Sequence, residues 1–197
     1  MLIDLLRKRY SCRKFSEKII SREIIEYILE SGRLSPSGGN EQPWKFGVIT
    51  DKEIICKISE AASMKYSQKW ISKAPLIIVL CTQIFDNINE NLYNRFPSMY
   101  DRIKIMDNNL YNIINMEEHQ TKIPGEHMVL AALEYGIFST WISHIDCEMV
   151  GELIGINGYY VTNVIAFGYP NEELKINPKK DLINITFTNH FSNTGFR

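Results

Sequence analysis

The chain has 197 residues, 45% of them hydrophobic and 23% charged, with a formal net charge of −1. This length fits one domain, and no Pro/Gly/Ser-rich linker or internal repeat divides it, so we expect a single domain over residues 1–197. The balanced charge gives no electrostatic reason to expect nucleic-acid or anionic-membrane binding. The apolar runs are too short to span a membrane, no secretory signal is recognisable, and the four cysteines are scattered, which together predict a cytoplasmic protein.

The first half of the chain alternates predicted helices and strands. Helices are predicted over residues 3–8, 21–33 and 50–62, and strands over 44–49 and 76–82. Ser21 is expected to cap the second helix and Gly32 to mark its end. Thr50 and Glu53 have the spacing of a capping box, which predicts that they satisfy each other's backbone amides at the start of the third helix.

The second half begins with the least regular segment, residues 83–122, which is polar, Asn-rich and dotted with aromatic residues. A long irregular stretch inside a compact domain is typically a lid over a site or a variable insertion. After it, helices are predicted over 125–135 and 148–154, and strands over 137–143, 161–167 and 182–188. Helices interleaved with strands indicate an α/β or α+β class.

A short segment of alternating basic and polar residues follows the first predicted helix. In an extended chain Arg9, Ser11 and Arg13 point the same way, since side chains alternate with a period of two. Two guanidinium groups and a hydroxyl on one face suit a phosphate or another anionic ligand. For this segment alone, an ordinary solvated basic surface is the alternative interpretation.

The loop over residues 35–44, SPSGGNEQPW, is the second candidate site. Its prolines, glycines and short polar side chains allow backbone and side-chain donors to approach a planar polar ligand closely. Taken alone, the same composition is also typical of an ordinary turn between a helix and a strand.

The two segments together, RxSxR about 25 residues before PSxxNxQPW, resemble the nitroreductase family. The resemblance continues through residues 135–137, 139–143, 165–170 and 177–180, and it weakens only over 83–122. It implies an α+β, nitroreductase-like fold, in which helices flank a central, mostly antiparallel sheet. It also implies an intertwined homodimer in which each flavin mononucleotide (FMN) contacts both subunits.

By this resemblance, Arg9 binds the FMN phosphate with help from Lys179, and Ser11 hydrogen-bonds the cofactor. Arg13 lies near the pyrimidine edge of the flavin, where a fixed cation favours two-electron reduction. Tyr10 is also predicted to be a cofactor-binding residue of this segment. It occupies a position where the family usually has a second basic residue.

The remaining cofactor-binding residues fall in the loop and in a later strand. Ser37 and Asn40 match loop positions that reach the flavin from the other subunit. Trp141, Ile142 and Ser143 match the strand that runs beside the isoalloxazine ring. Phe138, with its neighbour Ser139, replaces a smaller Gly-rich turn, which predicts a narrower ring pocket.

The function implied is that of an FMN-dependent NAD(P)H oxidoreductase. It would reduce nitroaromatic, quinone or similar electron-poor small molecules by ping-pong hydride transfer through flavin N5, with NADH or NADPH as donor and no catalytic side chain. The alternatives are a non-catalytic flavin-binding sensor or storage protein and a reductive dehalogenase-like member of the same fold. No metal site is expected, because His119 and His127 lack ligand spacing.

Overall fold

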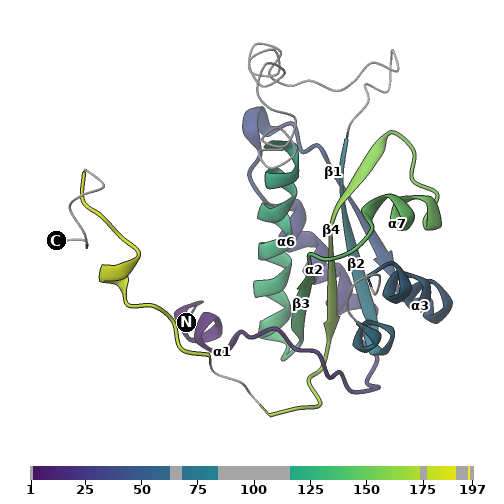
Figure 1. The fold of residues 1–197 in the computed structure, drawn as a ribbon, viewed down its shortest axis with the longest axis horizontal. Helices are drawn as coiled ribbons and strands as arrows, with labels where there is room; N and C mark the ends of the chain where they lie inside the picture. Colours follow the sequence, from purple (N-terminus) through teal and green to yellow (C-terminus); the bar gives the residue numbers. More distant parts are fainter. Residues whose placement is uncertain (1, 63–67, 84–115, 174–176, 190–194, 196–197) are drawn as a thin grey trace.

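The computed structural model describes residues 2–62, 68–83, 116–173, 177–189 and 195 (Figure 1). Its centre is a sheet in the order β1-β2-β4-β3, in which each neighbouring pair is antiparallel. The strands are β1 (Trp44–Ile49), β2 (Leu76–Gln83), β3 (Phe138–Ile142) and β4 (Tyr159–Gly168). This arrangement confirms the predicted antiparallel sheet and the α+β class.

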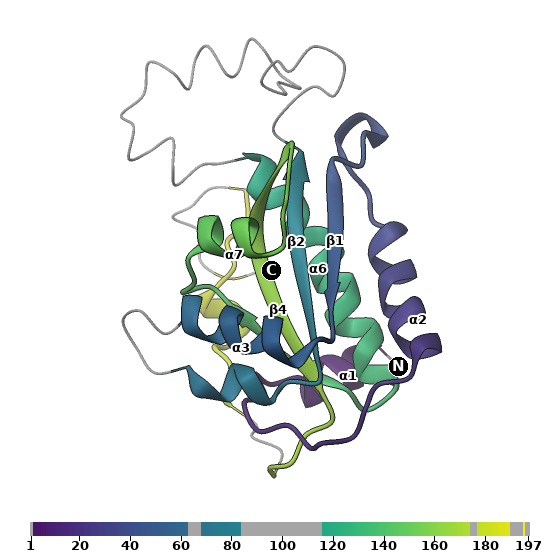
Figure 2. The same ribbon diagram turned by 90° about the vertical axis from the view of Figure 1, so that its right-hand side faces the viewer.

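Helices cover both faces of the sheet (Figure 2). The α-helices are α1 (Leu2–Lys8), α2 (Arg22–Arg33), α3 (Lys52–Ala61), α6 (Met116–Glu134) and α7 (Cys147–Leu153), and the short 3-10 helices are η1 (Gly38–Asn40), η2 (Lys69–Lys73) and η3 (Leu182–Asn184). Within the described residues, no helix is both long enough and apolar enough to cross a lipid bilayer.

Strand β2 holds the two layers of the core together, because its side chains alternate between them. Leu76, Ile78 and Leu80 belong to the buried cluster that includes residues of α2 and α6. The residues between them pack into the other cluster, with α3, α7 and the segment after α1. A strand buried on both faces reads as a continuous apolar run, which is why its limits were predictable.

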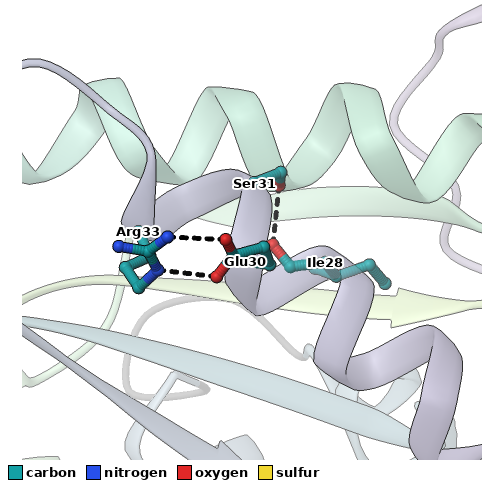
Figure 3. A network of polar contacts seen from close by, with 4 residues as sticks. All are labelled: Ile28, Glu30, Ser31 and Arg33. Atoms are coloured by element: carbon teal, nitrogen blue, oxygen red, sulfur yellow. Dashed lines mark hydrogen bonds and ion pairs between the residues drawn. The ribbon is translucent and has the colours of Figure 1, made fainter.

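Helix α2 runs through Gly32, so the prediction that Gly32 ends the helix is wrong. Gly32 is buried inside α2, and a Cβ atom there would meet the side chain of Met128 on α6. The glycine therefore allows two helices to approach closely rather than terminating one. The helix ends one residue after it, where Arg33 makes a two-bond ion pair with Glu30 (2.6 Å for each bond; Figure 3).

The cap of α3 also differs from the prediction. Asp51, not Thr50, is the N-cap residue, and its carboxylate accepts hydrogen bonds from the backbone N–H groups of Glu53 (2.9 Å) and Ile54 (3.0 Å). An aspartate next to a threonine competes for the same role, and its charge also favours the positive end of the helix dipole.

Replacing Asp51 with alanine is expected to lower the free energy of unfolding by about 1 kcal/mol, since the cap is lost. Thr50→Ala should change it by less than about 0.5 kcal/mol, because its hydroxyl does not cap the helix. Chemical denaturation of both variants measures the difference. Equal losses of stability in the two variants would support the predicted capping box, in which Thr50 is the N-cap residue.

Helix α6 begins at Met116, nine residues before the predicted start at Gly125, and includes Pro124. A Pro-Gly pair normally marks a helix boundary, which explains the error. Here the pair is buried, and a Cβ atom on Gly125 would lie 2.6 Å from Leu80 and even closer to the ring of Trp141. Residues 116–122 therefore form the first part of a helix, while 84–115, which make up most of the predicted lid or insertion, lie outside the described residues.

Gly125→Ala is expected to destabilise the protein, since the added methyl group overpacks the contact with the rigid Trp141 ring at a cost of about 1–3 kcal/mol. Gly32→Ala is the matched control. Both changes gain about 1 kcal/mol of helix propensity, but the methyl group at residue 32 meets the flexible end of Met128. Thermal and urea unfolding should show that the Gly125→Ala variant is clearly less stable than the Gly32→Ala variant. The reverse order would contradict this packing.

The tail does not form the predicted strand over 182–188. Residues 182–184 form η3, and the apolar side chains of Leu182, Ile183, Ile185 and Phe187 are all more than half exposed. The alternation of apolar and polar residues was therefore not a sign of one buried face within this chain. The tail runs away from the body of the sheet (Figure 1).

Candidate functional site

The basic segment after α1 lies along the edge strand of the sheet. Ser11 forms a parallel bridge with Ser139 of β3, and the backbone N–H of Cys12 donates to the Ser139 carbonyl oxygen (3.2 Å). The Thr140 hydroxyl donates to the Cys12 carbonyl oxygen (2.5 Å). These bonds hold residues 10–13 extended, as the sequence predicted.

Side chains of this segment alternate between the core and the surface. Tyr10 and Cys12 are buried, Arg9 is half-buried, and Ser11 and Arg13 are exposed. Among the residues that the structure describes, the Arg9 guanidinium has no hydrogen-bond or ion-pair partner. A cation that no described residue neutralises is suited to an anionic ligand.

Arg13 differs from Arg9 in its surroundings. Its guanidinium carbon lies 5.9 Å from the ring centroid of Trp70 in η2, within the range of a cation–π contact. Its backbone N–H donates to the carboxylate of Glu172 (3.1 Å). The structure thus places the two predicted cations in different settings: Arg9 has no partner among the described residues, and Arg13 lies over an aromatic ring.

Tyr10 is separated from Arg9, Ser11 and Arg13 by its orientation. Its ring packs against Phe138 with centroids 5.0 Å apart, and burial raises the pKa of its hydroxyl above the ordinary value. The two departures from the family pattern, Tyr10 and Phe138, are therefore one aromatic contact inside the core. Only the backbone of Tyr10 remains on the side of the strip formed by Arg9, Ser11 and Arg13.

The loop of residues 35–43 has a compact, unusual backbone. Gly39, Asn40 and Gln42 have φ angles of 58°, 56° and 50°, in the left-handed region. The Ser37 hydroxyl accepts a hydrogen bond from the Gln42 backbone N–H (2.9 Å), and the Gln42 amide donates to the Asn40 carbonyl oxygen (3.1 Å). The loop therefore presents an exposed Asn40 side chain, and its own polar contacts support the backbone shape.

The predicted residues of β3 point in different directions. Trp141 is half-buried beside α6, Ile142 is buried in the cluster that faces α3, and Ser143 is exposed directly after the strand. Lys179 is exposed in the tail. The structure gives Lys179 no contact with Arg9 or Ser11 in the same chain.

Within one chain, the strip and the loop lie at opposite ends of the sheet (Figure 1). Ser11 bridges Ser139, at the end of the sheet where Leu76 begins β2. Trp44, directly after the loop, pairs with Thr82 near the other end of β2. Six residues of strand, at about 3.3 Å each, separate the two ends by about 20 Å. A single chain therefore does not bring the two predicted halves of the site together.

Three residues near these segments were missed by the sequence reasoning. Glu172 and Trp70 contact Arg13, and His127 Nδ1 lies 2.8 Å from the Ser35 hydroxyl. The sequence carries no signal for Glu172 or Trp70, because each contacts Arg13 across a long stretch of chain. Within the described residues, no group of three metal-ligating side chains is found.

Comparisons with known proteins show similarity to one family over most of the chain. The nitroreductase family model matches residues 6–169. A relative from Archaeoglobus fulgidus, whose name places it among NADH dehydrogenases or NAD(P)H nitroreductases, is 30% identical over 187 residues, covering 92% of each chain. The oxygen-insensitive NADPH nitroreductase of Helicobacter acinonychis is 29% identical over 181 residues, covering 84% of this chain and 85% of the relative.

A solved structure has a similar fold. The FMN-dependent nitroreductase of Clostridium difficile R20291 aligns with a TM-score of 0.73 at 24% identity, covering 96% of this chain and 99% of that one. Since the family match extends over most of the chain, from the end of α1 to the residue after β4, and the fold agrees, the chain belongs to the nitroreductase family.

Proposed function

We propose that this chain is an FMN-dependent oxidoreductase that takes electrons from NADH or NADPH and reduces electron-poor small molecules such as nitroaromatics and quinones. The observation that carries the proposal is the setting of Arg9, a half-buried residue whose guanidinium has no hydrogen-bond or ion-pair partner within the described residues, in the same extended segment as the exposed Ser11. Membership of the nitroreductase family and the names of the relatives support it.

The residues present fit FMN. A phosphate ester carries almost two negative charges, and one guanidinium with a neighbouring hydroxyl supplies charge-assisted hydrogen bonds to it. Arg9 and Ser11 would hold the phosphate, and the exposed Lys179 adds a second cation from the tail. When bound, FMN supplies the two-electron chemistry, and the protein contributes binding, orientation and electrostatics.

Three further residues, Arg13, Trp141 and Ser143, would lie near the ring of the cofactor. Arg13, whose backbone is bound by Glu172 and whose guanidinium lies over the ring of Trp70, would provide the cation at this end. A preorganised charge costs little reorganisation during the reaction. Ser143 follows β3 as an exposed polar group, while the half-buried Trp141 packs against α6.

We propose that the site is completed by a second copy of the chain. The loop with Ser37 and Asn40 lies about 20 Å along the sheet from its own strip, so these residues would serve the strip of a partner subunit. The exposed apolar side chains support a dimer, because monomeric proteins rarely expose many together. They are Leu2, Ile3 and Leu6 in α1 and Leu182, Ile183, Ile185 and Phe187 in the tail.

Reduction of protein-bound flavin tests the proposed activity. Purified protein loaded with FMN should lose its flavin absorbance on mixing with NADH or NADPH without oxygen, and menadione or nitrofurazone should restore it. Bound flavin that neither nucleotide reduces would favour a sensor or storage protein. Protein that gains no flavin absorbance when FMN is added would contradict the cofactor assignment altogether.

A further inference from the structure

The loop of residues 35–43 is anchored to one face of α6. The Ser35 hydroxyl lies 2.8 Å from His127 Nδ1, and the backbone N–H of Gly38 donates to the side-chain oxygen of Gln120 (3.3 Å). Gln120 and His127 are seven residues apart in α6, and two helical turns bring such residues to the same face. One side of a helix therefore contacts the loop at two points.

The contact with His127 is the better protected of the two. Ser35 is only 5% exposed and His127 is half-buried. A hydrogen bond between Nδ1 and Oγ can form in every form of the imidazole. The hydroxyl donates when Nδ1 carries no hydrogen, and it accepts when Nδ1 carries one. Losing one partner leaves a buried polar group unsatisfied, which costs more than losing an exposed hydrogen bond.

The loop needs such an anchor because its backbone is strained. Asn40 and Gln42 are non-glycine residues in the left-handed region, a conformation that persists only where surrounding structure holds it. At the other end of the loop, the Gln83 backbone N–H donates to the Pro43 carbonyl oxygen (2.7 Å). The His127 contact fixes the first residue of the loop, and the Gln83 bond fixes the last.

We infer that His127 is a positioning residue for the cofactor: it holds the loop in the shape that presents Ser37 and Asn40 to the flavin bound on the partner subunit. The inference rests on the proposed function. His127 makes no contact with the flavin in this account and acts only through Ser35.

The test measures FMN affinity by fluorescence titration of three variants. His127→Ala should weaken binding by about fivefold to tenfold, as expected for a buried hydrogen bond. His127→Asn keeps a polar atom near the position of Nδ1 and should restore binding to within about twofold. Tyr27→Phe is the control, because it removes a different hydrogen bond between α2 and α6, from the Tyr27 hydroxyl to Glu134 (2.7 Å), and should leave affinity unchanged.

A double-mutant cycle separates positioning from general damage to the fold. Ser35→Ala should weaken FMN binding about as much as His127→Ala, and the double variant should be no weaker than either, because one interaction is removed in each case. Additive losses, failure of His127→Asn to restore affinity, or wild-type affinity in His127→Ala would overturn the inference. If wild-type protein itself does not bind FMN, the proposed function fails instead.

Discussion

Arg9→Ala should release FMN from the protein while leaving its fold intact. The guanidinium has no partner in the described part of its own chain, so its removal breaks no bond among those residues. A hydrogen bond to a charged group contributes about 1.5–3 kcal/mol, which corresponds to a loss of about tenfold to 150-fold in affinity. Equilibrium dialysis followed by flavin absorbance measures the loss.

Arg7→Ala is the matched control for this experiment. It removes the same charge two residues earlier, from an exposed side chain whose ion pair with Asp4 (3.4 Å) lies on α1. FMN affinity should stay within about twofold of wild type, since exposed ion pairs contribute little. Similar losses in both variants would mean that the effect of Arg9 is one of net charge, and equal retention in both would remove Arg9 from the site.

Leu182→Asp should dissociate the proposed dimer and lower FMN binding with it. Leu182 is 73% exposed in the single chain, in the tail that carries the other exposed apolar residues. If a partner covers this side chain, the change removes buried apolar surface and buries a charge, each at a cost of about 1.5 kcal/mol or more. The dimer dissociation constant, measured by sedimentation velocity, should rise at least about tenfold, since about 1.4 kcal/mol is one factor of ten.

Ile19→Asp provides the comparison, because Ile19 is 81% exposed and lies outside both the tail and α1. It introduces the same charge and should leave the association state unchanged. A monomer–dimer equilibrium that responds equally to the two substitutions would show that the tail has no special part in the interface.

The sequence predicted best those elements whose signal is local. The predicted limits of β1 were right at both ends. Pro43 precedes the mostly apolar run that forms the strand, and the polar Thr50 follows it. The alternation of residues 9–13 was also right, since side chains of an extended segment alternate in any context. Both depend on properties that a few neighbouring residues determine.

The errors arose where packing between distant segments decides the outcome. Gly32 and Gly125 look like helix ends, but each is buried inside a helix at a close approach to another side chain. Pro124 falls inside α6 for the same reason. Apolar alternation in the tail indicated burial, yet those side chains are exposed in the single chain. Whether such a residue ends a helix or is buried depends on the distant segment that packs against it, and neighbouring residues in the sequence do not indicate that segment.

The candidate site was predicted in part for a similar reason. The pair of motifs nominates Arg9 and Asn40 for the site, but neither motif shows that the two segments lie at opposite ends of the sheet. The contacts of His127 and Glu172 join residues far apart in the sequence, so no spacing rule finds them. Tyr10 was grouped with its neighbours by position, although its side chain faces the core.

A mixed dimer tests most directly whether each site is built from two chains. Subunits with Arg9→Ala and subunits with Asn40→Asp carry different affinity tags, are expressed together and are purified through both tags. Asn40→Asp keeps the side-chain shape and the left-handed backbone, but replaces the amide with a carboxylate that repels an anionic ligand. Each parent homodimer should bind FMN weakly at both of its sites.

If strip and loop come from different subunits, one site of the mixed dimer carries both defects and the other carries neither. The account predicts one FMN per mixed dimer, bound with wild-type affinity. If instead each chain forms its own site, every site carries one defect, and the mixed dimer will bind FMN no more tightly than its parents, which would contradict the account.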